Sequence, residues 1–227
     1  PTDIIETYGA DTARWFMLSD SPPERDVIWT EEGVQGAWRF VQRVWRLVGE
    51  IAATPARSST VPEFSDGALE LRRATHKTLA AVSKDIETLS FNRAVARIYE
   101  LVNQIGKTVH GGLTFEDVSW SAREAAECLV MMMAPMMPHL AEECWKELGH
   151  TGLVAEASWP AVDESLLVED SIVLPIQING KKKGEITVAR DAYNEVVEAA
   201  TLAEDFVQKA LEGRPPRKII VVPQRIV

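Results

Sequence analysis

Residues 176–188 read Ile176-Gln177-Ile178-Asn179-Gly180-Lys181-Lys182-Lys183-Gly184-Glu185-Ile186-Thr187-Val188. Apolar residues at every second position are typical of a half-buried strand, and the Asn-Gly pair is typical of a tight turn between two strands. The stretch therefore predicts a β-hairpin with three consecutive lysines beside its turn. Because most of residues 1–150 show helical period instead, the hairpin indicates a second, smaller structural module.

The register of this hairpin decides which of its side chains are buried. A two-residue turn would pair Ile178 with Lys181 and would place Ile186 on the wrong face. A three-residue or bulged turn would pair Ile178 with Lys182 and would bring Leu174 opposite Ile186. We therefore expect the wider turn.

Helical period and helix-ending residues predict a bundle before the hairpin. Thr30 is the expected N-cap of one long helix, and Ser121 is that of the helix before the break at Pro135 and Pro138. The methionines around this break are expected to fill the core. The expected helices span residues 3–8, 11–18, 31–53, 66–88, 91–110, 121–133 and 139–148.

Two further helices and a strand are predicted after the hairpin. Asp191 is the expected N-cap of the first helix, residues 201–204 form a capping box for the second, and Gly213 ends it. The β-branched residues 218–222 predict a strand. The chain is therefore expected to be mainly α, with a helical bundle followed by a small α/β module that contains the hairpin.

The formal net charge of the 227 residues is −10, but the charge is unevenly distributed. Residues 114–170 hold 12 acidic and 2 basic residues, whereas residues 31–113 and 171–227 each have a small basic excess. The acidic total therefore does not exclude a polyanionic partner such as RNA. The acidic block is expected to be a solvated outer face.

The sequence shows no pattern of an independent active site. It has no glycine-rich phosphate loop and no nucleophile elbow, and the stretch from His139 to Glu143 lacks the second histidine of a zinc motif. We therefore expect no catalytic residue, no metal and no cofactor in this chain. Cys128 and Cys144 form no C-x-x-C pair and suit a reducing cytosol, and no apolar run reaches the roughly 18 residues of a membrane span.

Three arginines of the expected helix 31–53 fall on one stripe. Arg39, Arg43 and Arg46 are spaced by four and three residues and lie within about 60° on a helical wheel. The stripe has two interpretations: a solvated face, or a row of guanidinium groups that bind phosphates. The opposite side is expected to hold Trp38, Val41, Trp45 and Val48, with Phe40, Val44 and Leu47 beside them.

Other cations are candidates for the same chemistry. Arg93 and Arg97 form a similar, weaker pair on the expected helix 91–110. Lysines beside a hairpin turn can instead serve to discourage edge-to-edge aggregation, but three in a row exceed that need. The candidate residues of the C-terminal module are Lys181, Lys182, Lys183, Arg190, Arg214, Arg217 and Lys218.

Several stretches resemble class I aminoacyl-tRNA synthetases, and the bacterial leucyl enzymes in particular. Asp3-Ile4-Ile5-Glu6-Thr7-Tyr8-Gly9-Ala10-Asp11-Thr12-Ala13-Arg14 resembles the segment after the KMSKS loop. Ser21-Pro22-Pro23-Glu24-Arg25-Asp26 and the run from Trp38 to Val48 are similar to the leucyl enzyme. Ala134-Pro135-Met136-Met137-Pro138-His139-Leu140-Ala141-Glu142-Glu143-Cys144-Trp145 resembles the last bundle helices of the class Ia tRNA-binding domain. Trp159-Pro160, Asp163-Glu164 and Gln177-Ile178-Asn179-Gly180-Lys181 resemble the bacterial leucyl C-terminal domain.

The resemblance implies a division of the chain into four parts. Residues 1–30 would be the end of the connection from the catalytic core and stem-contact region, and residues 31–150 a bundle of the class Ia anticodon-binding type. Residues 151–170 would be a linker, and residues 171–227 a truncated α/β module that binds tRNA. The catalytic and editing domains would be absent, so the fragment is expected to be inactive alone.

The resemblance also implies the partners. The parent enzyme would attach leucine to tRNA(Leu) with ATP and Mg²⁺, and this fragment would position the tRNA as a cytoplasmic monomer that contacts the remaining domains and no membrane. The arginine stripe would meet phosphates of the tRNA body, and the hairpin lysines the elbow. Two other classes stay open: a self-standing enzyme, and a helical scaffold that binds proteins through its acidic block without binding RNA.

Overall fold

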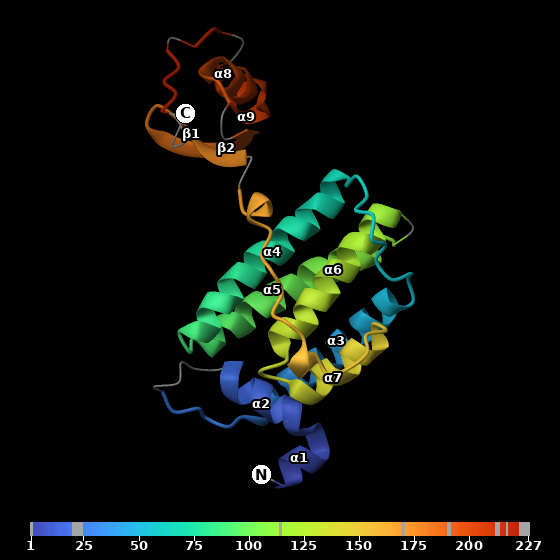
Figure 1. Cartoon of the computed structure of the whole chain (residues 1–227). Coiled ribbons are helices and arrows are strands. Elements are labelled where there is room, and N and C mark those ends of the chain that lie inside the picture. The colour runs from blue at the N-terminus through green and yellow to red at the C-terminus, as the bar shows by residue number, and fades with distance from the viewer. Residues whose placement is uncertain are drawn as a thin grey trace. The chain divides into compact units, whose positions relative to one another are not determined.

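A computed structural model describes residues 2–19, 25–113, 115–168, 171–189, 192–211, 214–216 and 218–222. The chain forms two compact units, residues 1–167 and 168–227. The described part of the first unit is helical, and that of the second unit combines a hairpin with two helices (Figure 1).

Helices α4, α5 and α6 lie side by side in the first unit, and α3 packs against α5, α6 and α7 (Figure 1). Two 3₁₀ turns, η1 and η2, follow α7 and contact the bundle helices. The elements are α1 (Thr2–Tyr8), α2 (Ala10–Ser19), α3 (Glu31–Ala52), α4 (Asp66–Glu87), α5 (Phe91–His110), α6 (Glu116–Met133), α7 (Pro138–Glu147), η1 (Val154–Glu156) and η2 (Glu164–Leu166).

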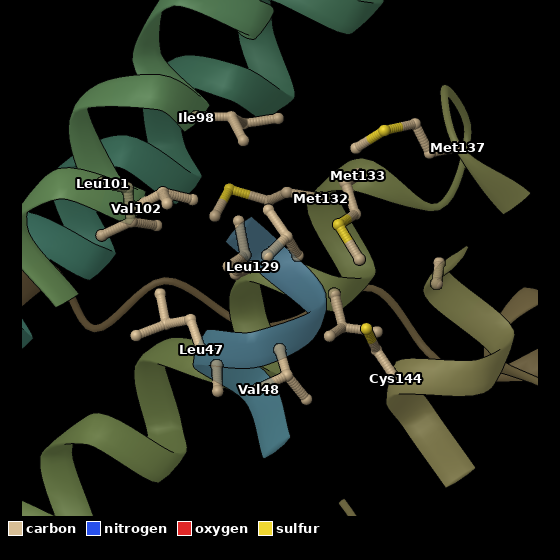
Figure 2. Packing of buried hydrophobic residues seen from close by; sticks show 14 of the residues in the cluster. Leu47, Val48, Ile98, Leu101, Val102, Leu129, Met132, Met133, Met137 and Cys144 are labelled. Atoms are coloured by element: carbon tan, nitrogen blue, oxygen red, sulfur yellow. The ribbon is translucent and has the colours of Figure 1, made fainter. Parts of the chain in front are cut away.

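The apolar faces of α3, α5, α6 and α7 meet in one core (Figure 2). Val48 of α3, Ile98 of α5 and Met132 of α6 are fully buried. The methionines around the proline break confirm the prediction of core packing, because Met133 and Met137 are also fully buried. An unbranched thioether side chain can fill the irregular space where a helix is interrupted.

The start of α6 corrects one prediction. Ser121 is not an N-cap: it lies within the helix, and its hydroxyl donates to the carbonyl of Val118 at 2.9 Å. The helix begins five residues earlier, with Glu116 and Asp117 in its first turn. Carboxylates in the first turn interact favourably with the helix dipole. These two acidic residues, and not a capping serine, are therefore the sequence feature that marks the start of α6. Thr30 does cap α3, since its side chain accepts from the backbone N–H of Gly33 at 3.3 Å.

The N-terminus of α7 is held by a carboxylate from another helix. Asp11 of α2 is buried and accepts from the backbone N–H of Leu140 at 2.6 Å. Its other oxygen lies 2.9 Å from Nδ1 of His139. The first N–H groups of a helix have no partner within it, so Asp11 performs the capping role that Met137 cannot.

One buried arginine joins the C-terminal ends of two helices. The guanidinium of Arg123 on α6 donates to the carbonyl of Thr54 at 3.1 Å and to those of Ile51 and Ala52 at 3.5 and 3.4 Å. It also donates to the carbonyl of Leu148, just after α7. The last carbonyls of a helix lack intrahelical donors, and a cation complements the dipole there. Arg123 therefore fixes α3 and α7 against α6.

The second unit is an antiparallel hairpin with two helices packed on it (Figure 1). Its elements are β1 (Ser171–Ile178), β2 (Lys181–Ala189), α8 (Asn194–Ala203) and α9 (Asp205–Leu211). Its core is formed by Leu174, Ile176, Ile186, Val188, Val197 and Val207. The absence of a side chain at Gly184 of β2 lets the ring of Phe206 of α9 approach closely, because a Cβ at this position would overlap that ring.

The register of the hairpin confirms half of the expectation. Leu174 pairs with Ile186 as predicted, but the wider turn is wrong because Ile178 pairs with Lys181 across a two-residue turn. Asn179 and Gly180 adopt φ values of 51° and 77°, the left-handed backbone that a two-residue turn needs. The register shifts between Ile176 and Gln177, and this bulge, not the turn, returns the apolar residues to one face.

Two further predictions for this unit are wrong. Thr201 does not start α9, because its hydroxyl donates to the carbonyl of Val197 at 2.7 Å within α8. The helix break follows at Glu204, where the backbone is extended. Residues 218–222 form no strand beyond an isolated bridge at Val222. The expected cap Asp191 and the expected end at Gly213 lie outside the described residues.

Candidate nucleic-acid interface

The arginine stripe is present on the outer side of α3. Arg39 and Arg46 are exposed, and Arg43 is half-buried, with Nη2 3.5 Å from where a Cβ on Gly106 of α5 would lie. None of the three forms an ion pair or a side-chain hydrogen bond with another described residue, although Glu50 is four residues after Arg46. Three guanidinium groups therefore keep their donors available for an external anion.

The tryptophans of α3 depart from the prediction. Trp38 and Trp45 are 41% and 40% exposed, so they do not belong to the buried face. That face is formed instead by Phe40, Val44 and Val48, each at most 3% exposed. A helical wheel places the tryptophans opposite the arginines, whereas the buried face of α3 points between the direction of the arginines and that of the tryptophans. The two half-exposed aromatic rings therefore lie on a different side of α3 from the stripe.

Arg93 and Arg97 of α5 differ from the stripe because they already have an anionic partner. Arg97 Nε lies 2.7 Å and Arg93 Nη2 3.1 Å from the two carboxylate oxygens of Asp85. Asp85 is 1% exposed, and a buried carboxylate needs such partners. These two arginines therefore have a structural role in the α4–α5 connection, and phosphate contact by them stays a prediction.

The hairpin displays its three lysines on the surface. Lys181, Lys182 and Lys183 are all exposed. Lys182 lies 3.1 Å from Glu185, but both side chains are more than half exposed, at 61% and 59%, so water screens the pair. Lys181 and Lys183 have no side-chain partner among the described residues.

The other expected cations of this unit are only partly described. Arg214 and Lys218 are exposed, without a side-chain partner among the described residues. Lys218 lines the same cavity as Gln177 and Asn179 of the hairpin. Arg190 and Arg217 lie outside the described residues.

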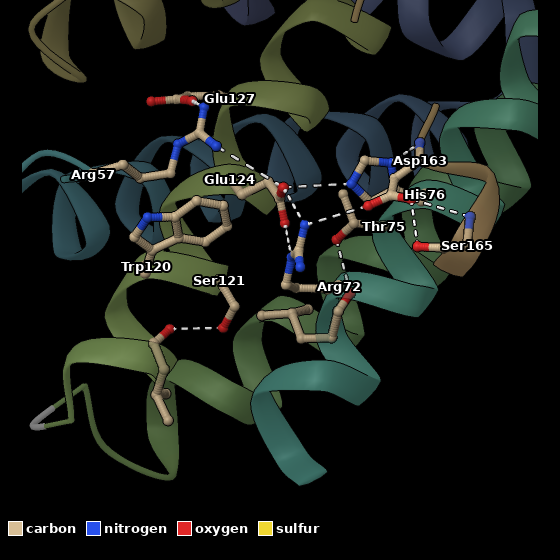
Figure 3. A network of polar contacts seen from close by, with 12 residues as sticks. Arg57, Arg72, Thr75, His76, Trp120, Ser121, Glu124, Glu127, Asp163 and Ser165 are labelled. Carbon is tan, nitrogen blue, oxygen red and sulfur yellow. Dashed lines mark hydrogen bonds and ion pairs between the residues drawn. The ribbon is translucent and has the colours of Figure 1, made fainter. Parts of the chain in front are cut away.

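A charged network inside the first unit was not predicted (Figure 3). Glu124 of α6 accepts from Arg72 of α4 at 2.7 and 3.1 Å and lies 3.4 Å from Nε2 of His76. Arg57 lies 3.9 Å from Glu124 and bonds to Glu127 at 2.5 Å. Burial raises the pKa of Glu124, but hydrogen bonds from His76 and Arg72 and the positive charge of Arg72 outweigh it, so the pKa is lowered.

The network extends to aromatic rings and to the segment after α7. Arg72 stacks over Phe64 at 4.5 Å and Arg57 over Trp120 at 4.9 Å, so each guanidinium is attracted by the face of an aromatic ring. The backbone N–H of Asp163 donates to Nδ1 of His76 at 3.0 Å. This bond assigns the ring proton to Nε2, where it faces Glu124. These side chains hold elements together, and their donors are already used.

Two absences hold for the described residues. No group of three or more His, Cys, Asp or Glu side chains among them could hold a metal ion. No helix in the described ranges is long and apolar enough to cross a membrane.

The family of the chain follows from comparison with known proteins. A family model described as the anticodon-binding domain of tRNA ligase matches residues 69–198, more than half of the chain. The fold therefore defines a member of this class of tRNA-binding helical domains.

The curated relatives identify the branch of that class. Leucine–tRNA ligase of Methylocella silvestris is 57% identical over 232 residues, and that of Afipia carboxidovorans is 59% identical over 229 residues. Both alignments cover 100% of this chain and 26% of the relative. The chain belongs to the leucyl-tRNA synthetase family, and it spans about a quarter of the length of these relatives.

Solved structures agree with the expected fold. A LeuRS of Agrobacterium radiobacter K84, solved in a ternary complex with tRNA and LeuAMS, matches 100% of this chain and 29% of its own at a TM-score of 0.76 and 27% identity. A methionyl-tRNA synthetase of Mycobacterium tuberculosis matches 66% of this chain and 34% of its own at a TM-score of 0.58 and 16% identity, which shows the shared fold alone. The mainly α architecture of the class Ia anticodon-binding type is thus confirmed.

Proposed function

We propose that this chain binds tRNA(Leu) and positions it for leucylation by other domains of a whole synthetase. The observation that carries the proposal is the arginine stripe of α3, whose three guanidinium groups have no partner among the described residues. Guanidinium groups bind phosphates bidentately, and such contacts fix the register and orientation of a nucleic acid.

The hairpin supplies a second cationic surface. Lys181 and Lys183 lie at the start of β2, just after the turn, without a side-chain partner among the described residues. In the proposal the bundle contacts the tRNA body and the hairpin contacts the tRNA elbow. The LeuRS of Agrobacterium radiobacter, which matches 100% of this chain, was solved in a complex with tRNA, which supports tRNA binding.

The chemistry of leucylation is assigned to the remainder of the parent protein. ATP and Mg²⁺ would act there, and this chain would contribute binding and orientation as a cytoplasmic monomer. Orientation alone can lower a reaction barrier by several kcal/mol, because it removes the entropic cost of aligning the reactants (about 7–11 kcal/mol at most).

Charge reversal tests the hairpin. In a whole synthetase that carries this chain, Lys181, Lys182 and Lys183 are changed to Glu, and affinity for tRNA(Leu) is measured across salt concentrations. The matched control reverses Lys84, Lys107 and Lys146, three exposed lysines of the bundle, so that the net charge is equal. We expect weaker binding and a smaller salt dependence only in the hairpin variant. Unchanged affinity and salt dependence there would remove the hairpin as a contact.

A further inference from the structure

A cavity of about 360 Å³ lies in the second unit, next to the hairpin turn. Its apolar wall comes from β1, α8, α9 and the segment after α9, and includes Ile176, Ile178, Leu202, Leu211 and Ile220. The volume is within the range of sites that hold small organic groups. The three consecutive lysines and this cavity therefore lie at the same end of the hairpin, the end with the turn.

The rim of the cavity is polar and cationic. Gln177 and Asn179 are exposed, and their amides can both donate and accept hydrogen bonds. Lys218 adds an ammonium group that has no side-chain partner among the described residues. None of the described lining residues is acidic. The mouth is thus complementary to an anion, while the interior is complementary to an apolar group.

We propose that this cavity receives an unstacked nucleobase of the bound tRNA. A nucleotide offers both complementary features, because its base has an apolar face and its phosphate is an anion. The base would lie against Ile178 and Leu202, the amides of Gln177 and Asn179 would meet its polar edge, and Lys218 would meet the adjoining phosphate. Proteins recognise RNA sequence mainly through such splayed bases.

The inference rests on the proposed function but adds a separate kind of contact. Lysines at the tip bind the sugar–phosphate backbone in any sequence, and salt screens that attraction. A base held against an apolar wall contributes affinity that salt does not screen. The second unit would therefore read one nucleotide, whereas the arginine stripe would not.

A pocket-filling substitution tests the inference on the whole 227-residue chain. Ala210 of α9 is exposed and lines the cavity, so Ala210→Trp would occupy it without changing charge. Ala199 of α8 is also exposed but does not line the cavity, so Ala199→Trp is the matched control. We expect Ala210→Trp to weaken tRNA(Leu) binding roughly 10-fold with an unchanged salt slope, and the control to bind normally.

A second measurement on the unmodified chain does not depend on how the variant folds. The backbone amide resonances are followed by NMR during titration with each nucleoside 5′-monophosphate and with inorganic phosphate. We expect shifts at Ile178 and Leu202 with nucleotides and not with phosphate. Equal binding by the two tryptophan variants, or equal shifts with phosphate alone, would overturn the inference. If the unmodified chain did not bind tRNA at all, the proposed function would be overturned instead.

Discussion

The arginine stripe of α3 and the arginines around Glu124 show the same residue type in two electrostatic situations. Arg72 is bound through two hydrogen bonds to a buried carboxylate, whereas Arg39 and Arg46 are exposed and have no ion-pair partner among the described residues. A paired arginine contributes to stability, and an unpaired one remains available for a partner. The difference shows that arginine spacing alone does not identify a face that could bind RNA. Whether a carboxylate of the protein already pairs with each arginine must also be known.

The largest effect is expected when the carboxylate shared by the paired side chains around Glu124 is removed. Glu124→Ala leaves Arg72 and His76 without their shared acceptor inside the bundle. We expect the free energy of unfolding in urea to fall by about 3–5 kcal/mol, because an uncompensated buried charge is costly. The folded fraction should bind tRNA(Leu) normally. A change of less than about 1 kcal/mol would show that the network is not structural.

The second effect concerns the pair on α5. The double variant Arg93→Gln and Arg97→Gln removes both cations from Asp85, which is 1% exposed. We expect a loss of about 1–3 kcal/mol in unfolding free energy, the cost of leaving a buried acceptor poorly satisfied. tRNA affinity should fall by less than about 3-fold, since these charges were already partly neutralised. A larger fall in affinity would show that Arg93 and Arg97 bind tRNA, as the arginine stripe of α3 is proposed to do.

The third effect is a change in the free energy of unfolding with pH. The pKa of Glu124 lies below its usual value of 4.5, because hydrogen bonds from His76 and Arg72 and the charge of Arg72 outweigh the effect of burial. Its contribution to stability is therefore fully present above the unfolded pKa and is lost as the pH falls through the folded pKa. Urea unfolding should show a steeper loss below about pH 4.5 in the natural chain than in Glu124→Gln. Parallel curves would contradict this assignment.

The smallest expected effect is an absence of reaction at the two thiols. Burial raises the pKa of Cys128 and of Cys144 to about 12. At about pH 8 almost no thiolate is present, so a thiol reagent should modify neither residue in the folded chain. The urea-unfolded chain should react fully, which is the control. Rapid modification of the folded chain would mean that the core around α6 and α7 opens more readily than its packing implies.

Much of the fold could be predicted from the sequence, because local signals determine it. Helical period identified the bundle helices, and alternation identified both strands of the hairpin. Two of the errors fell where two local signals compete. Ser121 looks like a cap but follows the acidic start of its helix, and the Asn-Gly turn kept its two-residue form because a bulge absorbed the extra residue.

The charged contacts could not be predicted in the same way. Arg72 and Glu124 are 52 residues apart in the chain, and Asp11 and Leu140 are 129 apart. Only the fold brings them together. The arginines of α3 were found because their stripe is a local pattern, but the lack of a partner for them among the described residues became visible only in the structure. The half-exposure of Trp38 and Trp45 was missed for the same reason, since the core direction of α3 depends on its neighbours.

The salt dependence of tRNA(Leu) binding tests the central claim most directly. Affinity is measured over a range of salt concentrations for the chain and for the triple variant Arg39→Gln, Arg43→Gln and Arg46→Gln. If the stripe binds three phosphates, the slope of log affinity against log salt should become less negative by about 2–3, and the unfolding free energy should change by less than about 0.5 kcal/mol. An unchanged slope with intact tRNA binding would contradict the assignment of α3 as the tRNA-binding face.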